Sequence, residues 1–510
     1  MSVAANSKVT TLDHLESIVL EGRRQGLRTV HCHGVFDLLH PGHIAHLKAA
    51  RRLGDRLIVT LTPDRFVNKG PFRPVFRESL RLETLSALEC VDHVALNDWP
   101  TAIETIRKIK PDIYVKGREY EEAGNDPTGN IALEEEAAKS VGAELVFTDG
   151  EVFSSSHLIN HFLAPYPAEM EMFLKDFRKR HSADDVISEI KRLAELNVLV
   201  VGEAILDQYC YCTALGKSPK EAIVATKFLS EEQFAGGALA TANHLAGFCG
   251  RVTLMTSIGS SEKDQAFIRS KLAPNVDWIP MVTADRPTVT KRRYVDPTYV
   301  SKMFEIQFLD DSPVSPELER RIIGALREQM GRHDLVVVND FGHGLLTESV
   351  REFLCASAPF LALNTQTNSA NMGFNPVTRY RRADYVCIDD PELRLAAGRP
   401  HGPVESIAPD IKRRLAASVL TVSLGSNGLV ILNDCKSVDR VPVMTTRVID
   451  RTGAGDALFA VTSPCVFRHM EPEMIGFIGN CVGALAVETV CNRDPVRPAR
   501  LFPFIKALLK

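Results

Sequence analysis

The stretch DRTGAGDALFA, residues 450–460, determines how the second half of this chain is interpreted. It places Thr452, Gly453, Ala454 and Gly455 directly before an acidic residue, Asp456, and an apolar helical run. Small residues let backbone N–H groups approach an anion, and the start of a helix adds positive potential. A carboxylate at position 456 can accept the proton of an attacking hydroxyl. The stretch therefore predicts a phosphoryl-transfer site, with a simple helix N-cap as the alternative for Asp456.

A second phosphate motif lies in the first part of the chain, at GVFDLLHPGH, residues 34–43. It follows a predicted strand and opens a predicted helix. Nucleotidyl transfer needs neutralisation of developing phosphate charge, which two imidazoles beside a helix N-terminus, His40 and His43, can supply. The alternatives are a structural role and a metal site, because five of the 15 histidines lie between His31 and His46. No carboxylate or third ligand is clearly placed with them, which disfavours a metal.

Composition limits the partners of the protein. The 510 residues suffice for two to four domains, and a net charge of −4 with no basic block disfavours nucleic acid. The 11 cysteines are scattered without a CxxC pair, so reduced thiols are expected rather than disulfides or a zinc site. The first residues lack the apolar core of a signal peptide, and no apolar run is long enough for a membrane span. We expect a cytoplasmic protein that does not associate with membranes.

Apolar runs and helical patterns alternate through most of the chain, which predicts two α/β domains built on parallel, doubly wound sheets. In the first part the predicted strands are 29–36, 55–63, 91–97, 111–117 and 143–150, with helices at 42–53, 78–88 and 131–141. After a helical connector at 166–195, strands are predicted at 197–206, 251–259, 334–340, 360–365, 383–390, 419–425 and 429–434. Residues 209–234 and 286–309 are strand-like without helices between them, which predicts a small accessory sheet over a cleft.

The first part resembles the HxGH nucleotidylyltransferases, most closely their cytidylyltransferase-type branch. The likeness extends from residues 34–43 to LGDRLIVTLTPD (53–64), NKGPFRPVF (68–76), RLETLSAL (81–88), DIYVKGREY (112–120) and VFSSSHLI (152–159). It implies a Rossmann-like domain at 1–165 in which His40 and His43 are catalytic. It also implies nucleotide or phosphate contacts at Gly34, Phe36, Asp37, Lys69, Arg73, Lys116, Arg118, Ser154, Ser155 and Ser156. For Lys69, Lys116 and Arg118 the alternative is a solvated surface position.

The second part, 196–510, resembles the ribokinase-like carbohydrate kinases of phosphofructokinase-B type. The likeness is carried by VVGEAILD (200–207), the glycine pair 236–237, TVTKRRYV (288–295), VSLGSNGLVIL (422–432) and DRTGAGDA (450–457). It implies Asp456 as the catalytic base, with nucleotide or phosphate contacts at Thr452, Gly453, Ala454, Gly455, Gly425 and Gly428. It further implies a β lid, a homodimer formed through it, and sugar contacts at Asp207, Gly236, Gly237, Lys291 and Arg293.

Together the two parts resemble the bifunctional heptose kinase/nucleotidylyltransferases of nucleotide-sugar precursor synthesis, with the order of the domains reversed. The resemblance implies Mg²⁺, ATP as the kinase donor, and ATP or CTP as the nucleotidyl donor. The implied small-molecule partners are a sugar phosphate and a nucleoside triphosphate.

Three departures from the kinase pattern concern the acceptor side. GGALATA (236–242) carries Ala240 where the family has asparagine, and LNTQTNSANMGFN (363–375) replaces an Asp-Pro-Lys segment. DDPE (389–392) keeps Glu392, a weak candidate for a metal ligand, but has Asp389 where the family has asparagine. Because a lost polar partner changes specificity strongly, we expect a different acceptor or a degenerate kinase domain.

Three functional hypotheses follow. The first is a bifunctional kinase and nucleotidylyltransferase, and the second is a nucleotidylyltransferase whose kinase-like domain only binds ligands or dimerises. The third, a non-catalytic nucleotide sensor, is disfavoured because His40, His43 and Asp456 are all present. The sequence does not determine the sugar, the nucleotidyl donor or the order of the two steps.

Overall fold

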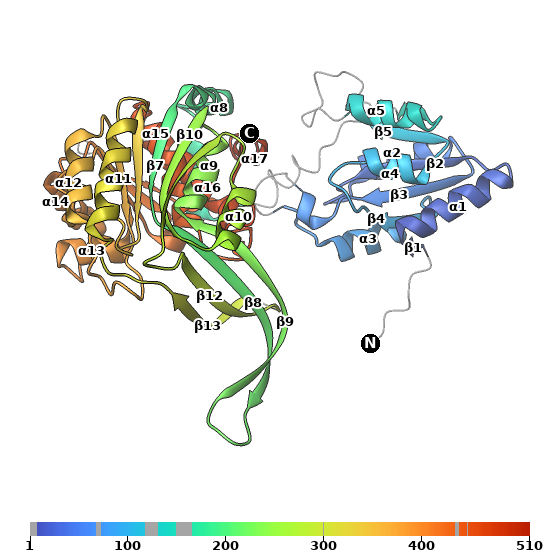
Figure 1. Ribbon diagram of the computed structural model, residues 1–510. Coiled ribbons are helices and arrows are strands. Elements are labelled where there is room, and N and C mark those ends of the chain that lie inside the picture. The colour runs from blue at the N-terminus through green and yellow to red at the C-terminus, as the bar shows by residue number, and fades with distance from the viewer. Residues whose placement is uncertain are drawn as a thin grey trace. The chain divides into compact units, whose positions relative to one another are not determined.

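The computed structural model of the protein describes residues 8–67, 73–117, 131–148, 166–298, 300–433, 438–445 and 447–510. The chain divides into two compact units, Met1–Pro167 and Ala168–Lys510, and both are drawn in Figure 1. Each unit is built on a sheet of its own. No helix in the described ranges is both long enough and apolar enough to cross a membrane.

The first unit is centred on a parallel sheet. Its described strands are β1 (Val9–Thr10), β2 (Thr29–Gly34), β3 (Arg56–Leu61), β4 (His93–Leu96), β5 (Ile113–Gly117) and β6 (Glu144–Thr148). They lie in the order β1-β4-β3-β2-β5-β6, and every neighbouring pair is parallel. From β2 the chain builds the sheet outward through β3 and β4, and then returns to add β5 and β6 on the other side. The switch point of this topology, where α/β sheets bind ligands, lies between β2 and β5.

Helices cover both faces of this sheet. They are α1 (Leu12–Arg24), α2 (Pro41–Arg51), α3 (Glu78–Ser86), α4 (Ile103–Ile109) and α5 (Ile131–Ser140), with a short 3₁₀ turn η1 (Asp64–Phe66). Alternate residues of β3 point to opposite faces. Leu57 and Val59 join the apolar cluster that includes Leu47 of α2 and Leu85 of α3, whereas Ile58 packs in the cluster of α1 and α4. This alternation fixes the register of the sheet between its two helical layers.

The second unit has a larger mixed sheet. Its order among the described residues is β11-β10-β7-β14-β15-β16-β17-β18-β19. The strands are β7 (Asn197–Gly202), β10 (Arg251–Gly259), β11 (Val276–Thr283), β14 (Leu335–Asp340), β15 (Leu361–Thr365), β16 (Tyr385–Asp389), β17 (Val419–Ser423), β18 (Leu429–Leu432) and β19 (Val438–Val441). Pairing is parallel from β11 to β17, and β18 and β19 are added antiparallel.

Two helical layers enclose this sheet. One contains α11 (Pro316–Gln329), α12 (Glu348–Ser357), α13 (Asp390–Ala397) and α14 (Val404–Arg414), whose leucines and isoleucines share one apolar cluster with the sheet. The other contains α9 (Ala238–Ala246), α15 (Ala454–Phe467) and α16 (Pro472–Ala486), which pack on one another. Most residues of α15 and α16 are buried, as expected of helices that are apolar all round. The remaining elements are α10 (Glu262–Lys271), α17 (Pro498–Leu508), η5 (Val377–Arg379) and η6 (Gly425–Asn427).

The segment expected to connect the domains is helical. It forms α7 (Ala168–Phe177), α8 (Ala183–Lys191) and η4 (Arg192–Glu195), which belong to the second unit. The Phe177 ring stacks on Phe477 of α16 with centroids 4.5 Å apart, and the Arg178 guanidinium donates to the carbonyl oxygen of Leu508. These contacts anchor the segment to the kinase-like unit.

A separate four-stranded sheet, called the lid below, confirms the expected accessory sheet. It consists of β8 (Ala204–Lys217), β9 (Val224–Gly237), β12 (Val289–Asp296) and β13 (Ser301–Phe308), in the order β13-β12-β8-β9. A single residue, Glu203, separates β8 from β7, so the lid grows directly out of the main sheet. Figure 1 shows the β8–β9 ribbon extending well beyond the other two lid strands.

Candidate active sites

The first candidate site lies at the switch point of the first unit, where β2 ends and α2 begins. Gly34 is the last residue of β2, and Phe36 adopts a left-handed backbone conformation with φ 48°. A Cβ atom at Gly34 would lie 3.0 Å from the Phe36 ring. The glycine therefore gives this ring room beside the strand end.

The two histidines of the motif stack at the start of α2. His40 is the N-cap residue, and its ring centroid lies 3.9 Å from that of His43, with 31° between the planes. The Phe36 ring meets His43 edge-on at 5.4 Å. The first backbone N–H groups of a helix lack intrahelical acceptors and attract anions. The structure thus brings two imidazoles together with a helix N-terminus that suits a phosphate.

Asp37 and Arg73, both expected to contact phosphate, form a buried ion pair with each other. The guanidinium lies 2.8 Å from the carboxylate, and the two side chains are 4% and 2% exposed. The other carboxylate oxygen accepts the backbone N–H of Phe76 at 3.1 Å. The pair therefore ties the segment around 73–76 to the turn before α2.

Lys116, at the end of β5, is also paired within the unit. Its ammonium lies 2.8 Å from Glu134 of α5, and the Tyr114 hydroxyl donates to the same carboxylate at 3.0 Å. Both charged side chains are largely buried. This contact gives the lysine a structural partner, which the sequence pattern did not indicate.

The other histidines of the motif region lie apart from the stacked pair. His31 and His33 share the hydroxyl of Thr60 at 2.7 and 2.9 Å. Burial, and then the charge of Lys116, lowers the pKa of His31 to about 3, and the same two causes lower the pKa of His33. Both imidazoles are therefore neutral. Across the described ranges, no group of three or more His, Cys, Asp or Glu residues is arranged to hold a metal ion.

Arg81 of α3 is a site-supporting residue that the sequence reasoning missed. Its buried guanidinium donates to the carbonyl oxygens of Val35, Phe76 and Thr62, and it pairs with Asp64. It thereby ties Val35, inside the predicted phosphate motif, to the backbone at Thr62 and Phe76. The signal in the sequence that could have found it is its position as the first residue of RLETLSAL, a stretch that resembles the family. Lys69, Arg118, Ser154, Ser155 and Ser156 lie outside the described residues.

The second candidate site is centred on Asp456, in the first turn of α15. Its side chain is buried, and one carboxylate oxygen accepts hydrogen bonds from Asn339 at 3.2 Å and Gln366 at 3.0 Å. Burial and the charge of Asp207 raise the pKa of Asp456 to about 7, against the opposing charge of Lys291. A carboxyl with this pKa exchanges protons near neutral pH, which suits a general base.

The turn before Asp456, predicted to bind an anion, depends on glycine at its N-cap and is open beside Gly455. Gly453 is the N-cap of α15 with φ 86°, and a Cβ atom there would overlap the Asn492 side chain. A Cβ atom at Gly455 would meet nothing within 4 Å, so open space lies beside that glycine. Ala454 begins the helix between them. Gly453 thus permits the left-handed backbone conformation at the N-cap, and Gly455 leaves open space for a ligand.

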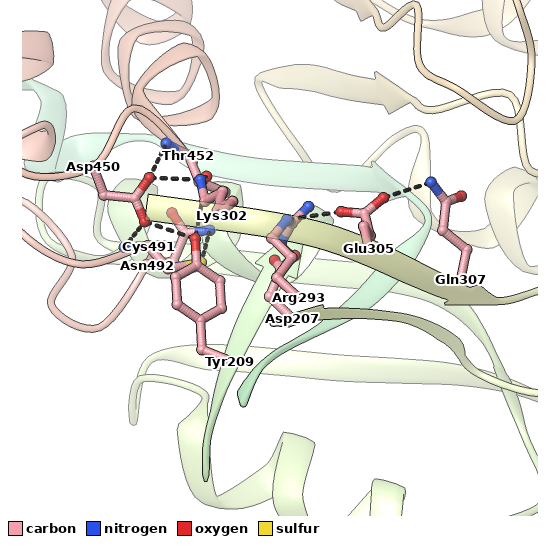
Figure 2. Close-up of polar contacts among 10 residues, drawn as sticks. All are labelled: Asp207, Tyr209, Arg293, Lys302, Glu305, Gln307, Asp450, Thr452, Cys491 and Asn492. Carbon is pink, nitrogen blue, oxygen red and sulfur yellow. Dashed lines mark hydrogen bonds and ion pairs between the residues drawn. The ribbon is translucent and has the colours of Figure 1, made fainter. Parts of the chain in front are cut away.

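The predicted sugar-contacting residues gather beside this turn. Asp207 of β8 pairs with Arg293 of β12, which also lies 2.7 Å from Glu305 of β13 (Figure 2). A Cβ atom at Gly236 would overlap the Asp207 carboxylate. Lys291 is 7% exposed, and burial lowers its pKa although Asp207 and Glu305 oppose that change. Gly237 has φ 59°, and a Cβ atom there would lie 2.6 Å from the carbonyl oxygen of Glu203.

The rebuilt segments have clear structural positions. Gln366, from the stretch that replaces Asp-Pro-Lys, and Asn339 at the end of β14 supply the two amides that hold Asp456. Asp389 and Glu392 form a capping box at the start of α13, and Glu392 also accepts the N–H of Thr367 at 3.0 Å. Burial, and then the charge of Asp389, raises the pKa of Glu392 to about 8.

The glycines of the predicted nucleotide turn bracket η6. Gly425 has φ 59° with open space where a side chain would be. Gly428 has φ 83°, and a Cβ atom there would overlap the carbonyl oxygen of Val441 in β19. The turn therefore depends on glycine at its second end for close contact with the neighbouring strand.

Comparisons with known proteins agree with this division. The family model for cytidylyltransferase-like domains matches residues 31–160. The model for the pfkB family of carbohydrate kinases matches residues 195–498, and the chain belongs to this family. The predicted α/β folds of both parts are confirmed. The chain thus combines a segment that matches cytidylyltransferase-like domains with a pfkB-family carbohydrate kinase domain.

Similar curated proteins match the N-terminal part. The bifunctional protein HldE of Methylobacillus flagellatus is 49% identical over 123 residues, which is 24% of this chain and 25% of that protein. HldE of Gluconobacter oxydans is 44% identical over 134 residues, 26% of each. The matched stretch thus spans about a quarter of these relatives. Phosphofructokinase-2 of Escherichia coli, crystallised with substrates and products, aligns with TM-score 0.49 and 14% identity over 60% of this chain and 97% of that one.

Proposed function

We propose that the protein is a bifunctional enzyme of nucleotide-sugar precursor synthesis. Residues 196–510 phosphorylate a sugar or sugar phosphate with ATP, and residues 1–165 transfer a nucleotide to a sugar 1-phosphate with release of pyrophosphate. Residues 166–195 connect the two as a helical segment. The observation that carries the proposal is the buried Asp456 carboxyl beside the Gly453–Gly455 turn, in a chain that also stacks His40 on His43 at a helix N-terminus.

In the kinase reaction Asp456 accepts the proton of the acceptor hydroxyl. The hydroxyl oxygen then forms a bond to the γ-phosphorus as the bond to the leaving ADP oxygen breaks. The N–H groups of the turn and the start of α15 stabilise the charge on the transferred group. A pKa raised to about 7 places the proton exchange of Asp456 near neutral pH, as a general base requires.

A Mg²⁺ ion in this domain would be held mainly by the nucleotide phosphates, because the described residues contain no group of three or more His, Cys, Asp or Glu residues arranged to hold a metal ion. Glu392 is buried, accepts backbone N–H groups from Asp389 and Thr367, and has its pKa raised further by the charge of Asp456. A divalent cation held mainly by nucleotide phosphates would relieve this repulsion, with Glu392 as the carboxylate nearest to a ligand role. The ion supplies charge neutralisation on the phosphates.

In the nucleotidyl transfer reaction His40 and His43 donate to the α-phosphate and to the departing pyrophosphate. The attacking group is the phosphate of a sugar 1-phosphate, and the donor is ATP or CTP. Lys116, Arg73 and Asp37 support the site through the ion pairs described above. A heptose-like sugar is proposed on the resemblance to the heptose enzymes.

The protein is proposed to act in the cytoplasm as a homodimer formed through the lid. Support comes from the exposed apolar side chains that the lid strands carry, among them Leu215, Val224, Phe228 and Phe304, which are 52–69% exposed. Apolar patches of this kind mark interaction sites. Light scattering of the purified protein tests the dimer, and Phe228→Glu with Phe304→Glu is expected to yield monomer.

The two activities are tested with the purified full chain, Mg²⁺, ATP or CTP, and a panel of sugars and sugar phosphates. His43→Ala is expected to abolish pyrophosphate release and to keep ADP formation, and Asp456→Asn is expected to do the reverse. Loss of both products in His43→Ala, or in Asp456→Asn supplied directly with a sugar 1-phosphate, contradicts independent sites.

The second candidate is a nucleotidylyltransferase with a degenerate kinase domain. It is favoured by the replaced acceptor residues, Ala240 and the 363–375 segment. It predicts that no acceptor yields ADP and that Asp456→Asn changes no product. Any ADP formation that depends on Asp456 excludes it.

A further inference from the structure

A buried carboxylate lies where the lid meets the turn that opens α15. The Asp450 side chain is 2% exposed and is contacted by two lid residues (Figure 2). The Tyr209 hydroxyl of β8 donates to it at 2.6 Å, and the Lys302 ammonium of β13 donates at 2.8 Å. The backbone N–H groups of Thr452 and Cys491 complete its hydrogen bonding, at 3.0 and 3.1 Å. Asp450 therefore joins the lid to the turn.

The same two lid side chains also reach the next polar group of the turn. The Lys302 ammonium donates to the Thr452 hydroxyl, and the Tyr209 hydroxyl lies 3.3 Å from the same oxygen. Tyr209 is fully buried, whereas the Lys302 side chain is 34% exposed. The first residues of the DRTGAGD stretch are thus held by two lid side chains, together with the backbone N–H of Cys491, rather than by α15 itself.

The charge balance of Asp450 depends on the lysine. Burial acts to raise the pKa of this carboxyl, but the hydrogen bonds from Lys302, Tyr209 and the Thr452 backbone, together with the charge of Lys302, outweigh burial, and the pKa is lowered. Within the described part of the chain, Lys302 is the cation that forms an ion pair with Asp450. Removing one partner of such a pair leaves a buried charge supported by neutral donors, which is strongly unfavourable.

The strand that carries Lys302 also contacts the acceptor side of the site. Glu305, three residues further along β13, pairs with Arg293, and Arg293 pairs with Asp207 (Figure 2). β13 is the edge strand of the lid. One short strand therefore contacts both the phosphoryl-binding turn and the group that holds the proposed sugar ligand.

We propose that Lys302 is a positioning residue of the kinase domain, which ties the lid to the Asp450–Gly455 turn and keeps the N–H groups of that turn aimed at the transferred phosphoryl group. The inference rests on the proposed kinase function for its catalytic consequence. It goes beyond that function because it makes the geometry of the turn depend on a docked lid. A displacement of about 1 Å in such groups is enough to slow a reaction roughly 100-fold.

The test compares three full-length variants with the wild type. Lys302→Met removes the ammonium and keeps an apolar stem, Lys302→Arg keeps the charge, and Lys217→Met is a matched control at an exposed lid lysine. Hydrogen exchange of peptides covering residues 450–457 reports the turn without any need for activity. Steady-state ADP formation, with the acceptor found in the panel, reports kcat and the KM for ATP.

We expect faster exchange at 450–457 in Lys302→Met, with kcat lowered roughly 10- to 100-fold and KM changed less. Lys302→Arg is expected to restore part of the slow exchange and part of kcat, and Lys217→Met is expected to match the wild type. Unchanged exchange in Lys302→Met overturns the inference, as does equal loss in Lys217→Met. If wild-type protein forms no ADP with any acceptor, the proposed kinase function fails, and the exchange measurement still decides whether Lys302 holds the turn.

Discussion

Replacing Asp456 with asparagine is expected to stabilise the second unit, and to do so more at high pH than at low pH. The carboxyl has an ordinary pKa of 3.8, and burial with the nearby charge of Asp207 raises it to about 7 in the folded protein. The folded state therefore disfavours the charged form. The contribution of this group is favourable below pH 3.8 and is lost as the pH rises to about 7.

The size of the effect follows from the two pKa values. Their difference corresponds to about 4 kcal/mol of lost stability at pH 8, and to about 2 kcal/mol at pH 5, where the folded carboxyl is still protonated. The unit spans Ala168–Lys510, for which the unfolding entropy is about 0.7 kcal/mol per kelvin. Asparagine removes the charge and keeps an acceptor for Asn339 or Gln366. We expect a rise in Tm of about 6 °C at pH 8 and about 3 °C at pH 5.

Scanning calorimetry of the full chain at both pH values measures this difference. Asp450→Asn is the matched control, because the pKa of that carboxyl is lowered in the folded state and its contribution is favourable above the unfolded value. The control should therefore lower the Tm of the same transition at pH 8. An Asp456→Asn protein that is no more stable than the wild type at pH 8, or equally stabilised at both pH values, would refute the reasoning.

Three further predictions concern the two sites. Gly453→Ala, at φ 86° against Asn492, should destabilise the second unit by about 1–2 kcal/mol in calorimetry and abolish ADP formation while pyrophosphate release continues. Arg81→Met removes a buried guanidinium that donates to three carbonyl oxygens. The free energy of unfolding of the first unit should therefore fall by about 3–5 kcal/mol, with that of the second unit unchanged. Gln366→Leu removes a hydrogen-bond donor to the charged form of Asp456, so the pKa of Asp456 should rise further. In a pH profile of kcat/KM for ADP formation, the rising limb should therefore move to a higher pH than in the wild type, where it lies near pH 7. A limb that does not move contradicts the role of the amide.

Much of the fold could be predicted because it depends on residues that are close together in the sequence. The predicted strands 334–340 and 419–425 contain the buried strands β14 and β17, although β17 ends at Ser423, and the strand-like stretches without helices form the lid. The phosphate motifs are equally local, since a strand end, a turn and a helix start occupy consecutive residues. His40 and His43 are three residues apart and Gly453 is three before Asp456, so their meeting requires little beyond the start of a helix.

The partners of those residues could not be predicted in the same way. The sequence predicts Lys116 as a phosphate contact or a solvated cation and does not single out Arg81, yet the structure pairs Lys116 with Glu134 and buries Arg81 against backbone carbonyls. The segment that replaces Asp-Pro-Lys was expected to alter the acceptor side alone. In the structure its Gln366 also holds the catalytic candidate Asp456.

The sequence by itself determined two α/β units, their order and a short predicted phosphate motif in each. It could do so because hydrophobic periodicity and turn-forming residues depend on residues that are close together in the sequence. Tertiary structure decided how those motifs are held. Gln366 meets Asp456 across 90 residues, Lys302 meets Asp450 across 148, and Tyr209 meets Asp450 across 241. Such contacts depend on which strands become neighbours in a sheet, and burial in that setting sets the pKa of Asp456.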